Sequence, residues 1–461
     1  MRRSLVVAGA VLALTAASAH AQGSAVMTHS SCATAMGAAG VAEPCDDGSA
    51  ILFNPAAIAT QGSVVGVGWT GITTGGGFTY DFTGERIERE ASTASVPFLF
   101  ASHRFTDRLA AGIGVFNPYG LTIDWGEPEG FEGRYVSYET QLRNIYIQPT
   151  VAFRAGSWLS FGAGVDVVAA SIDINQRVDL ATTPLPAGLA PFAGATFGNV
   201  GVPLGTDFAD AGLSGTGTGV GFHLGAQARF TERLSMGVRY LSEVSIDYEG
   251  DAEFTQVPTN YALPTGLPLD PVLAQQFAAG GPLASQALAT NLTLPQQLVV
   301  GVAVRPIPAL RILADYQWTG WSSFDEAPID FQGGGTDQTL VLDYQDADTY
   351  RFGAELMATP ALALRGGFIY NTAAEREFSV SPLLPEAERN YYSAGLGYRL
   401  GNGLGIDAGY QHIDQSDRRG RVRGRAPGLT QQQLEALNVG VYDADAHLLN
   451  VTLSYRFGGQ R

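Results

Sequence analysis

The sequence predicts an all-β fold: a 14-stranded antiparallel transmembrane β-barrel with an N-terminal hatch, or plug, inside its lumen. Three observations favour this fold. Apolar and polar residues alternate along most of the chain, 45% of the 461 residues are hydrophobic while only 15% are charged, and 58 residues are glycine. Beyond residue 21 the chain has no long apolar run that would cross a bilayer as a helix, so crossing by strands is favoured.

The first 21 residues have the features of a secretory signal peptide. Arg2 and Arg3 precede an apolar run from Leu5 to Ala19, and a second small residue stands at Ala21. A basic start, a short apolar core and small residues before the cleavage point are typical of exported proteins. We expect cleavage after Ala21. The alternative, a membrane anchor, requires an apolar run closer to the ~20 residues that span a bilayer.

Residues 22–61 show no strand alternation and precede the first strand, so they are the expected hatch. Barrels of eight strands are filled by their own side chains, whereas porins of 16 to 18 strands leave a water channel. A barrel of intermediate size therefore needs a plug. Cys32 and Cys45 lie in this segment. In an oxidising periplasm we expect them to form a disulfide, the alternative being two buried thiols.

Period-two alternation continues from residue 62 to residue 457. Leu310, Ile312, Ala314 and Tyr316, for example, alternate with mostly polar neighbours, which places one set toward lipid and the other toward the lumen. The expected strands span residues 62–84, 93–105, 108–118, 138–154, 158–177, 217–230, 233–249, 291–305, 309–325, 339–357, 361–375, 388–400, 403–415 and 443–457. An even number of strands places both termini on the periplasmic side.

Short turns and long loops alternate between these strands. Turn-forming residues near 106–107, 155–157, 231–232, 306–308, 359–360 and 401–403 predict the periplasmic connections. Longer connections near 178–216 and 250–290 are expected outside the cell. The last strand ends at Phe457, before a tail of residues 458–461. An amphipathic last strand ending in an aromatic residue resembles the signal that the barrel-insertion machinery recognises, so this machinery is an expected partner.

The charge of the chain argues against one class of partner. The formal net charge is −17, and every basic residue is arginine. Nucleic acid is not an expected partner, because binding its phosphates needs a basic surface. A basic run between the last two strands comprises Arg418, Arg419, Arg421, Arg423 and Arg425. Contact with lipopolysaccharide phosphates and plain solvation are the two interpretations of this run.

Five motifs, in this order, resemble those of the FadL family of outer-membrane transporters for hydrophobic compounds. They are GAAGVAEPCDDGSAILFNPA at 37–56, GIGVFNPYGL at 112–121, LSEVSIDY at 241–248, LPQQ at 294–297 and WTGWSSF at 318–324. The resemblance implies a barrel plugged by its hatch, extracellular loops that capture ligand, and an apolar pocket beside the hatch. It also implies a lateral exit where the third strand kinks, with diffusive transport of long-chain fatty acids or aromatic hydrocarbons.

The residues of the third strand suit such a gate. Pro118 has no N–H and cannot complete a sheet ladder, and Asn117 and Gly120 lie beside it. The alternative is an ordinary strand end, since Asn-Pro-Tyr-Gly also forms good turns. The expected gate comprises Asn54, Pro55 and Ala56 of the hatch and Phe116, Asn117, Pro118, Tyr119 and Gly120 of the strand.

The two longest loops are unusually apolar. The candidate residues of a capture groove are Leu189 and Phe192 in the first loop and Val272, Leu273 and Phe277 in the second. Asp270 is the expected N-cap of a helix that carries the last three. Exposed apolar patches tend to mark binding surfaces; the alternative is that the loops pack on each other.

One departure from the family pattern bears on the ligand. The resemblance implies a basic side chain on the fifth strand, near the ligand carboxylate of fatty-acid transporters. Ser171 stands at this position, and Arg177, later in the chain, is the candidate substitute. This difference favours a neutral ligand over an acid.

We therefore expect a monomeric, non-enzymatic outer-membrane protein, without cofactor or metal, that transports hydrophobic molecules by diffusion. Its other expected partners are outer-membrane lipid and lipopolysaccharide. One alternative is a barrel enzyme that modifies lipids, which needs a Ser–His pair at the lipid boundary. The histidines are scattered, and no Gly-x-Ser-x-Gly motif accompanies them. The other alternative is an adhesin or purely structural barrel.

Overall fold

The computed structural model describes residues 28–91, 93–185, 194–262, 266, 268–424 and 429–457. Several predictions fall outside these residues: the signal peptide at 1–21, residues 22–27 of the predicted hatch, Leu189, Phe192, Arg425 and the tail at 458–461. Within the described residues, no helix combines the length and apolar character that crossing a membrane requires.

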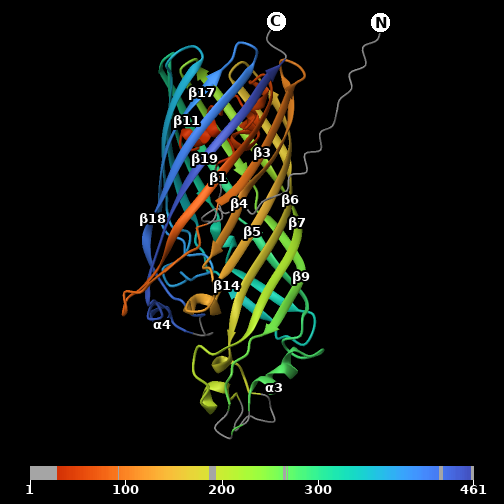
Figure 1. Cartoon of the computed structure of the whole chain (residues 1–461). Coiled ribbons are helices and arrows are strands. Elements are labelled where there is room, and N and C mark those ends of the chain that lie inside the picture. The colour runs from red at the N-terminus through yellow and green to blue at the C-terminus, as the bar shows by residue number, and fades with distance from the viewer. Residues whose placement is uncertain are drawn as a thin grey trace.

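The chain forms a closed antiparallel barrel (Figure 1). β1 (Ser63–Tyr80) pairs along its whole length with β19 (Gly440–Phe457), so the first and last strands close the wall. The strands between them are β2 (Arg86–Glu88), β3 (Thr93–Arg104), β4 (Leu109–Asp124), β5 (Glu139–Arg154), β6 (Leu159–Asp179), β7 (Asp207–Thr231), β8 (Leu234–Leu241), β9 (Val244–Gln256), β10 (Gln286–Leu294), β11 (Gln297–Ile307), β12 (Leu310–Thr319), β13 (Glu326–Phe331), β14 (Gln338–Val341), β15 (Ala347–Met357), β16 (Leu362–Asn371), β17 (Arg389–Arg399) and β18 (Leu404–Gly420).

Fourteen crossings of the wall account for the 19 strands of the sheet. β2 pairs only with the last residues of β1. Four crossings are each split in two, because β8 leads into β9, β10 into β11, β12 into β13 and β14 into β15. Setting aside β2 and one half of each split crossing removes five strands from 19, which leaves 14. The predicted 14-stranded antiparallel barrel is confirmed.

Among the strand boundaries that differ from the prediction, three have a clear physical reason. β4 continues to residue 124 instead of ending at 118, because Asn117 and Pro118 form a bulge within the strand. β7 begins at residue 207 instead of 217, since residues 207–216 pair with β6 although their alternation is weak. β18 extends to residue 420, so Arg418 and Arg419 belong to a strand, paired with β19 after a register shift, and not to a loop.

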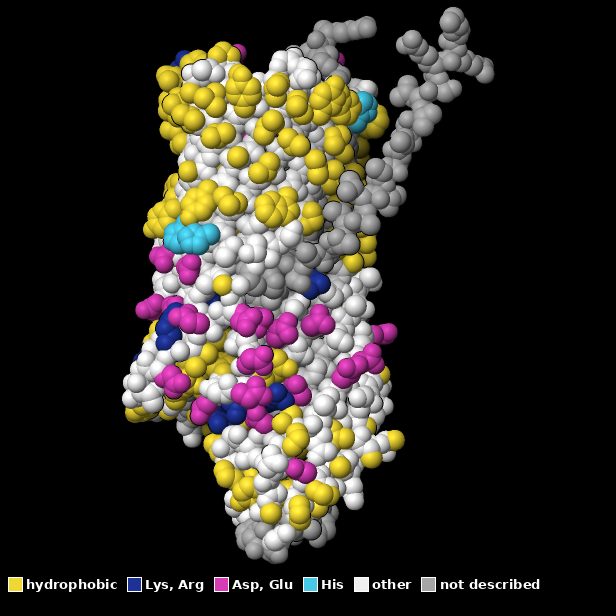
Figure 2. Space-filling view, in the orientation of Figure 1, with side chains coloured by type: hydrophobic (Ala, Val, Ile, Leu, Met, Phe, Trp, Pro, Cys, Tyr) yellow, Lys and Arg dark blue, Asp and Glu magenta, His cyan; other side chains and the backbone are white. Residues whose placement is uncertain are grey.

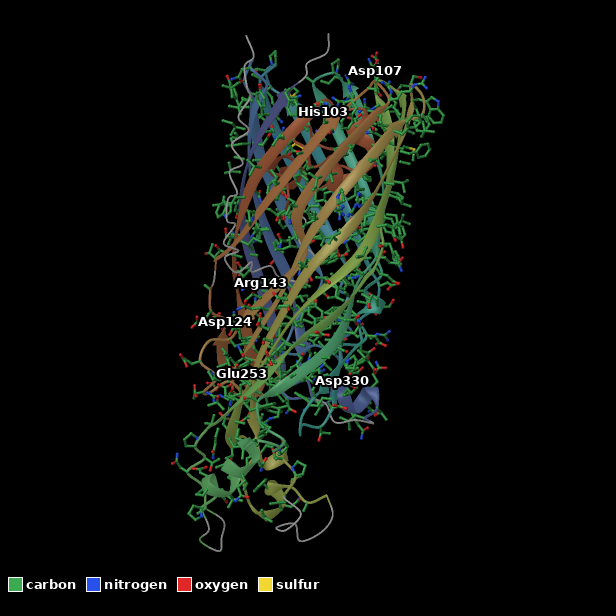
Figure 3. All side chains as sticks on the ribbon, turned by 90° about the vertical axis from the view of Figure 1, so that its right-hand side faces the viewer. His103, Asp107, Asp124, Arg143, Glu253 and Asp330 are labelled. Carbon is green, nitrogen blue, oxygen red and sulfur yellow. A yellow bond between two sulfur atoms is a disulfide. The ribbon has the colours of Figure 1, made fainter. Side chains whose placement is uncertain are left out.

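The two ends of the barrel differ in their surfaces. The short turns lie at the top in Figure 1, and Asp107 marks this end in Figure 3, whereas Glu253 and Asp330 lie toward the other end. On the face shown in Figure 2, apolar side chains form a belt over the half with the short turns, and acidic side chains gather beyond it; exposed apolar side chains of the other strands continue the belt. On β19, Val451 is 46% exposed while Thr452 beside it is buried. The belt therefore marks the half of the barrel that crosses the membrane.

The two longest connections pack on each other beyond the other half. They form η3 (Leu180–Thr182), η4 (Phe197–Val200), α3 (Asp270–Leu273) and η5 (Ala274–Phe277). Leu180, Phe197, Phe208 and Leu273 share a small buried core, and Phe277 packs against it. The remaining short helices of the other connections are η2 (Glu132–Tyr135), η6 (Trp321–Ser323) and α4 (Gln431–Glu435).

The predicted cap at Asp270 is wrong. Asp270 is the first residue of α3, whose N-cap position belongs to Leu269. The Asp270 carboxylate instead accepts hydrogen bonds from the backbone N–H of Thr259 at 2.9 Å and from its hydroxyl at 2.6 Å. The side chain thus holds the preceding loop, which competes with capping for the same carboxylate.

Candidate functional site

Residues 28–61 fill the part of the barrel that lies within the belt, and nearly all of them are buried. This hatch contains α1 (Ser31–Ala35), α2 (Ala50–Phe53) and η1 (Pro55–Ala59). Ser30 caps α1, since its hydroxyl accepts from Ala33 N at 3.0 Å and donates to Asp47 at 2.5 Å. Burial raises the pKa of Asp47 above its usual range. Helices this short need such caps and outside contacts to remain folded.

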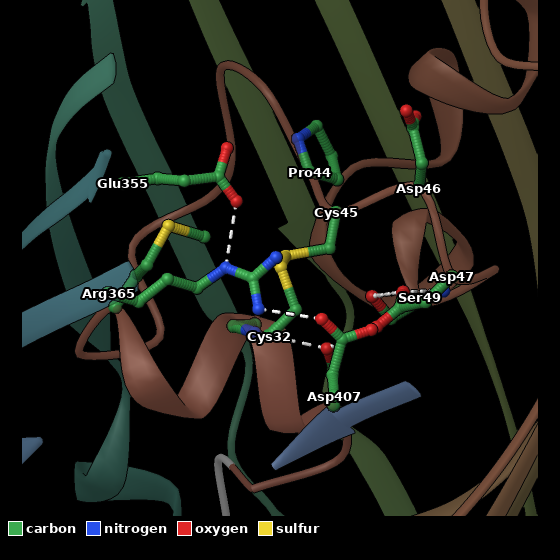
Figure 4. The surroundings of a disulfide bond; sticks show 12 residues. Cys32, Pro44, Cys45, Asp46, Asp47, Ser49, Glu355, Arg365 and Asp407 are labelled. Atoms are coloured by element: carbon green, nitrogen blue, oxygen red, sulfur yellow. Dashed lines mark hydrogen bonds and ion pairs between the residues drawn. A yellow bond between two sulfur atoms is a disulfide. The ribbon is translucent and has the colours of Figure 1, made fainter. Parts of the chain in front are cut away.

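A disulfide joins α1 to the segment that precedes α2. The Cα atoms of Cys32 and Cys45 are 6.2 Å apart across this bond (Figure 4). Beside it, Arg365 donates to Glu355 at 2.7 Å and to Asp407 at 2.6 Å. These charged groups border a cavity of about 770 Å³ at the end with the short turns, which arginine and acidic side chains line. The space between the hatch and the short turns is therefore polar.

Glycines bring the barrel wall into direct contact with the hatch. A Cβ atom on Gly237 would overlap Val41, and one on Gly367 would overlap Gly37. Ten glycines, each on a different strand, have hatch atoms within close range of the missing Cβ, and we call them the glycine ring: Gly66, Gly112, Gly162, Gly225, Gly237, Gly301, Gly353, Gly367, Gly395 and Gly409. The hatch therefore lies directly against the backbone of the wall, with its own backbone at six of these positions and with hatch side chains at the other four.

Polar contacts fix the orientation of the hatch. The Asp315 carboxylate of β12 accepts hydrogen bonds from Gly40 N at 2.7 Å and Val41 N at 3.0 Å. Glu43 forms an ion pair with Arg305 at 2.7 Å, and its side chain is only 12% exposed. Charge-assisted hydrogen bonds in a partly dry interior are stronger than neutral ones, so these contacts hold the hatch in one position.

Asn54, Pro55 and Ala56, predicted beside the strand bend, have their closest contacts elsewhere. Asn54 donates to the carbonyls of Val41 at 2.7 Å and Ala226 at 3.0 Å, and Pro55 packs at Gly162 and Gly225 of β6 and β7. The glycine ring accounts for this placement, because β6 and β7 offer the room that the Asn-Pro-Ala turn needs. Other hatch residues, His29, Leu52 and Phe53, lie at the bend.

The ladder of the wall is interrupted beside β4. β3 and β4 pair only from Arg104↔Ala110 to Leu99↔Val115, although both strands extend further. Between Phe116↔Tyr146 and Tyr119↔Asn144, β4 advances three residues while β5 advances two. β4 therefore carries one extra residue, a bulge at Asn117 and Pro118, and beyond it residues 93–98 of β3 have no partner on β4.

The interruption has a far limit. Glu90 N donates to the Asp124 carbonyl at 2.9 Å and so joins the two sides again. Within the interruption, Gly120 pairs with Arg143 of β5, which lies near mid-height of the barrel in Figure 3. A Cβ atom on Gly120 would meet only the Leu142 carbonyl oxygen, at 3.5 Å, so a side chain fits there. We call this unpaired stretch between β3 and β4 the window.

His29 of the hatch stands at the window. Its Nε2 accepts a hydrogen bond from Asn117 N at 3.1 Å, and its ring contacts Phe98 and Phe116, with centroids 6.1 and 5.5 Å away. Burial lowers the pKa of His29 to about 3, against the smaller opposing effect of the Asn117 hydrogen bond. The imidazole is therefore neutral at ordinary pH, and the inner side of the window is lined by aromatic rings.

Tyr119 lies on the inward face and connects β4 to another interruption of the wall. Its hydroxyl donates to the Pro295 carbonyl at 2.7 Å, at the break between β10 and β11, and accepts from Gln297 at 2.8 Å. The Tyr119 ring contacts Tyr146 of β5 and Trp321 of η6, with centroids 6.1 and 6.0 Å away. The bend thus directs a fully buried tyrosine across the lumen.

Aromatic side chains continue from Tyr119 toward the end with the long loops. Trp321 contacts Phe324 and Tyr344, with centroids 5.8 and 6.2 Å away. Tyr344 lines a cavity of about 840 Å³, together with Leu340, Leu383 and other apolar residues, and with Glu375 and Arg421. The interior between this cavity and the window is therefore mainly apolar and aromatic.

A second cavity, of about 710 Å³, lies between the long loops. Phe208, Leu213 and Leu283 line it, as does Arg177. Of the predicted groove residues, Leu273 is fully buried, and Val272 and Phe277 are half-buried. The loops therefore pack on each other through Leu273 and leave this cavity beside the contact, while Leu189 and Phe192 lie outside the described residues.

The two residues predicted near a ligand carboxylate do not face the hatch. On β6, Asp166, Val168 and Ala170 are buried while Val165 and Val167 are exposed, so Ser171 continues the outward face. Arg177 pairs with Glu129 at 3.1 Å and Asp210 at 3.6 Å at the loop end. Strand alternation explains the error for Ser171, because a shift of one residue reverses the side-chain direction.

The arginines near the end of β18 are engaged within the protein. Arg419 forms an ion pair with Asp81 at 2.5 Å, and Arg421 is buried and donates to the carbonyls of Phe378 and Ser379, both at 2.8 Å. Arg418 donates to the Glu375 carbonyl at 3.0 Å, and Arg423 to Asp179 at 3.0 Å. Each of these four side chains therefore already has a partner within the protein.

A buried polar chain joins β5, β6 and β7. Thr150 Oγ1 is 2.9 Å from His223 Nε2, and His223 Nδ1 is 2.5 Å from Asp166 Oδ1. The order of groups is that of a nucleophile, a base and an orienting acid. All three side chains are at most 3% exposed and face inward, so they do not meet the lipid boundary that a lipid-modifying enzyme requires.

Sequence reasoning missed His29, Phe98 and Arg239, a buried residue of β8 near the window. His29 lies in a segment with no alternation, so its contact with Asn117 had no signal in the sequence. Arg239 occupies an inward position of an alternating strand, and this position was detectable, but its burial at 5% exposure follows from the hatch above it. The window's Pro118 was found because proline lacks an N–H.

The chain resembles known outer membrane proteins over most of its length. A family model described as outer membrane protein transport protein (OMPP1/FadL/TodX) matches residues 12–457. An outer membrane protein of Neisseria meningitidis serogroup B is 25% identical over 90% of this chain and 91% of its own. A long-chain fatty acid transport protein of Escherichia coli O157:H7 is 24% identical over 71% of this chain and 72% of its own.

Solved structures share the fold. The crystal structure of a Pseudomonas aeruginosa FadL homologue has a TM-score of 0.77 and 21% identity, and the match covers 94% of this chain and 100% of that chain. The Pseudomonas putida toluene transporter TodX has a TM-score of 0.68 and 18% identity over 95% of this chain and 99% of that one.

Proposed function

Because the chain belongs to the OMPP1/FadL/TodX family of outer membrane transport proteins, we propose that it carries hydrophobic compounds inward across the outer membrane by passive diffusion. Long-chain fatty acids and similar lipidic or aromatic molecules are the proposed cargo. The cargo enters from the end with the long loops, passes the aromatic interior and leaves sideways into the membrane. The protein needs no cofactor for this process.

The window is the observation that carries the proposal. It is an unpaired stretch of wall between β3 and β4, lined on the inside by Phe98, Phe116 and His29. A hydrophobic molecule that leaves sideways enters lipid directly and never pays the free-energy cost of crossing water. Unpaired backbone facing lipid is costly, so an interruption at this place in an otherwise paired wall calls for a functional reason.

The polar cavity between the hatch and the short turns supports the same direction of exit. Arg305, Arg311 and Arg365 line it together with Glu43 and Glu355. A hydrophobic molecule that moved along the barrel axis toward the short turns would have to pass the hatch backbone and then this charged space. Apolar surface gains about 25 cal/mol per Å² on leaving water, so the lateral path is favoured over the axial one.

The capture end of the path consists of the two cavities near the long loops. The cavity of about 840 Å³ leads to Tyr344, and the cavity of about 710 Å³ lies between the loops. Sites for lipid-sized ligands are concave and mostly apolar, with a few polar groups. One copy of the chain suffices, because β1 and β19 close the wall of the described barrel without an open edge.

Deletion of Pro118 tests the lateral route. β4 carries one extra residue at the bulge, so removing Pro118 equalises the count with β5 and lets the ladder continue. We expect cells that express this variant to take up labelled oleate or labelled toluene no faster than cells without the protein. Pro118→Ala is the matched control, because it keeps the extra residue and the bulge.

Folding is checked separately from uptake. Both variants must reach the outer membrane and shift in electrophoretic mobility when heated in SDS, as intact barrels do. Normal uptake through a folded Pro118 deletion would contradict the lateral route. Loss of uptake in Pro118→Ala as well would show that the proline itself, and not the length of the strand, sets the gate.

A further inference from the structure

A hollow lies on the outer surface of the barrel, within the apolar belt and close to the short turns. Its volume is about 560 Å³, and strands β4 to β8 line it. Of the described residues in its lining, Tyr240 alone carries a polar side-chain group, and the Tyr240 hydroxyl already donates to Gln296 Oε1 at 2.8 Å. The hollow therefore offers an apolar surface on the side of the wall that faces lipid.

The hollow exists because small outward side chains stand beside large ones on neighbouring strands. Ala163 of β6 stands between Val151 of β5 and Leu224 of β7 in the paired register. One row nearer the turns, Ala226 of β7 stands opposite Phe161 of β6. The three large side chains are 45–57% exposed, so they rise from the wall while the two alanines form the floor.

The hatch supports this floor from the inside. Gly162 and Gly225 lie next to the two alanines in the sequence, and a Cβ atom on either glycine would overlap Pro55 of the hatch. The wall therefore cannot move inward at this point, and the hollow keeps its shape without an occupant. A preformed site loses less free energy to ordering when a ligand binds.

Two arginines stand where the hollow meets the short turns, at the end that Asp107 marks in Figure 3. Arg108 directly precedes Leu109 and Arg154 directly follows Phe153, both of which line the hollow. Arg154 N donates to the Arg108 carbonyl at 2.8 Å, so the two residues are neighbours. The Arg154 guanidinium donates to two carbonyls of its turn. Within the described residues, neither arginine has a carboxylate at ion-pair distance, so their two charges are not compensated there.

Aromatic side chains place the same end at the membrane surface. Trp158, in the turn between β5 and β6, stacks on Phe230 of β7 with ring centroids 6.3 Å apart, and both side chains are more than half exposed. Aromatic girdles of transmembrane barrels lie at the level of the lipid head groups, and the short turns face the periplasm. A lipid in the hollow therefore belongs to the periplasmic leaflet, and its head group lies at the level of the two arginines.

We propose that the hollow binds one phospholipid of the periplasmic leaflet. An acyl chain lies on the floor formed by Ala163 and Ala226, and the phosphate lies at Arg108 and Arg154. A chain on a flat wall touches protein on one side only, whereas a chain in the hollow is also flanked by large side chains and gains dispersion contacts. Arginine binds phosphate through charge-assisted hydrogen bonds. The site lies outside the wall, so the proposal does not depend on the transported compound.

Native mass spectrometry of the full chain tests the site. The protein in a nonionic detergent is mixed with dioleoyl phosphatidylglycerol, and the collision energy is raised until loosely held lipid leaves. We expect a single phosphatidylglycerol to remain on each wild-type chain. Dioleoylglycerol has the same acyl chains without the phosphate, and its retention should be lower on the order of tenfold.

Two pairs of substitutions separate the acyl chain from the head group. Ala163→Leu combined with Ala226→Leu fills the hollow and keeps the surface apolar, so retention of phosphatidylglycerol should fall on the order of tenfold. Ala354→Leu is the matched control, because Ala354 is an outward residue of β15 that does not line the hollow. Arg108→Gln combined with Arg154→Gln should reduce the retention of phosphatidylglycerol to that of dioleoylglycerol.

The mobility shift on heating in SDS checks that each variant is folded, and each alanine is also replaced singly in case the double variant does not fold. A wild type that loses its last phosphatidylglycerol together with the others overturns the site, as does a folded variant with a filled hollow that retains this lipid normally. Equal retention of the two lipids by the wild type overturns the assignment to a phospholipid. These outcomes leave the transport proposal standing, since the Pro118 deletion tests that proposal separately.

Discussion

His29 shows how one side chain links the hatch to the wall. As a neutral imidazole it accepts the N–H of Asn117, a group that the bulge of β4 leaves without a ladder partner. A protonated imidazole has no acceptor nitrogen, so this contact depends on the charge state. Burial lowers the pKa of His29 to about 3, whereas an unfolded histidine titrates near about 6.5.

This difference predicts that the hatch loosens as the pH falls. Between pH 6.5 and 3 the unfolded hatch binds a proton that the folded hatch does not, so the stability of the hatch decreases as the pH falls through this range. At pH 5 the loss is about 2 kcal/mol, from about 1.5 pH units at about 1.4 kcal/mol each. Hydrogen-exchange protection factors of residues 28–61 at pH 7.5 and pH 5, each relative to intrinsic rates, measure it.

His29→Gln is the control for this prediction. Its carboxamide is an acceptor that does not titrate, so its protection factors should change less between the two pH values. An equal loss of protection in the wild type and in His29→Gln would assign the effect to other groups, with Asp47 excluded because its raised pKa predicts the opposite pH trend.

Single residues were predicted from the sequence only where their chemistry is local. Pro118 breaks a ladder wherever it stands, because it has no N–H, and the bulge is found there. Arg239 has the same alternation as many inward arginines, and its burial depends on where the hatch and the neighbouring strands lie. Ser171 was placed in the lumen by alignment, and the strand alternation shows that it faces outward.

Elements were predicted well where alternation was regular and poorly where glycine replaced it. The extension of β7 back to residue 207 buries only small apolar residues such as Ala209 and Ala211 between aspartate and glycine, so its alternation is weak. β4 was ended at Pro118 because a proline normally stops a paired strand, yet the strand resumes once one extra residue is absorbed. The hatch helices, each of at most five residues, are too short for a helical period to be visible.

The glycine ring predicts how the hatch seals the barrel. Gly367 and Gly366 are neighbours on β16, but a Cβ on Gly367 would overlap Gly37 of the hatch, while one on Gly366 would meet nothing nearer than the Ser393 carbonyl, at 3.9 Å. Gly367→Leu should therefore displace the hatch, because backbone cannot move aside as a flexible side chain does. Gly366→Leu adds the same side chain toward the outside.

Single-channel recording in planar bilayers measures this effect. We expect wild type and Gly366→Leu to show little ion conductance and Gly367→Leu to show a clear increase. Equal conductance of the two variants, in either direction, would mean that close contact at Gly367 does not determine the seal.

At the scale of the whole molecule, the apolar belt fixes how the barrel sits in the membrane. Val451 lies between Leu449 and Tyr455 on the exposed face of β19, with Leu453, and all are 46–61% exposed. An arginine near the midplane of a transmembrane barrel costs about 2–4 kcal/mol. Val451→Arg should therefore decrease the free energy of unfolding in lipid vesicles by about that amount.

Denaturant titration in vesicles checks this value, with Val451→Leu as the control that keeps the surface apolar. A cost below about 1 kcal/mol for Val451→Arg would place this position near a membrane interface instead of the midplane. The belt would then lie at a different height from the one that the exposed side chains of β19 indicate.

The overall architecture was the part that the sequence predicted best. Fourteen crossings, the order of short and long connections and the closure of the wall all follow from period-two alternation interrupted by turn formers. Alternation does not specify how the interior is filled, because the fit between hatch and wall depends on residues far apart in the sequence.

The close fit of the hatch also constrains how the barrel is built. Only residues 60–62 connect η1 to β1, so the hatch stays beside the first strand from the moment both exist. Its atoms lie against ten strands at positions where a side chain on the wall would overlap them, so a finished cylinder leaves little room for this segment to thread through afterwards. The hatch therefore has to be enclosed while the cylinder is still open. The cylinder then closes where the first strand, β1, pairs with the last strand, β19.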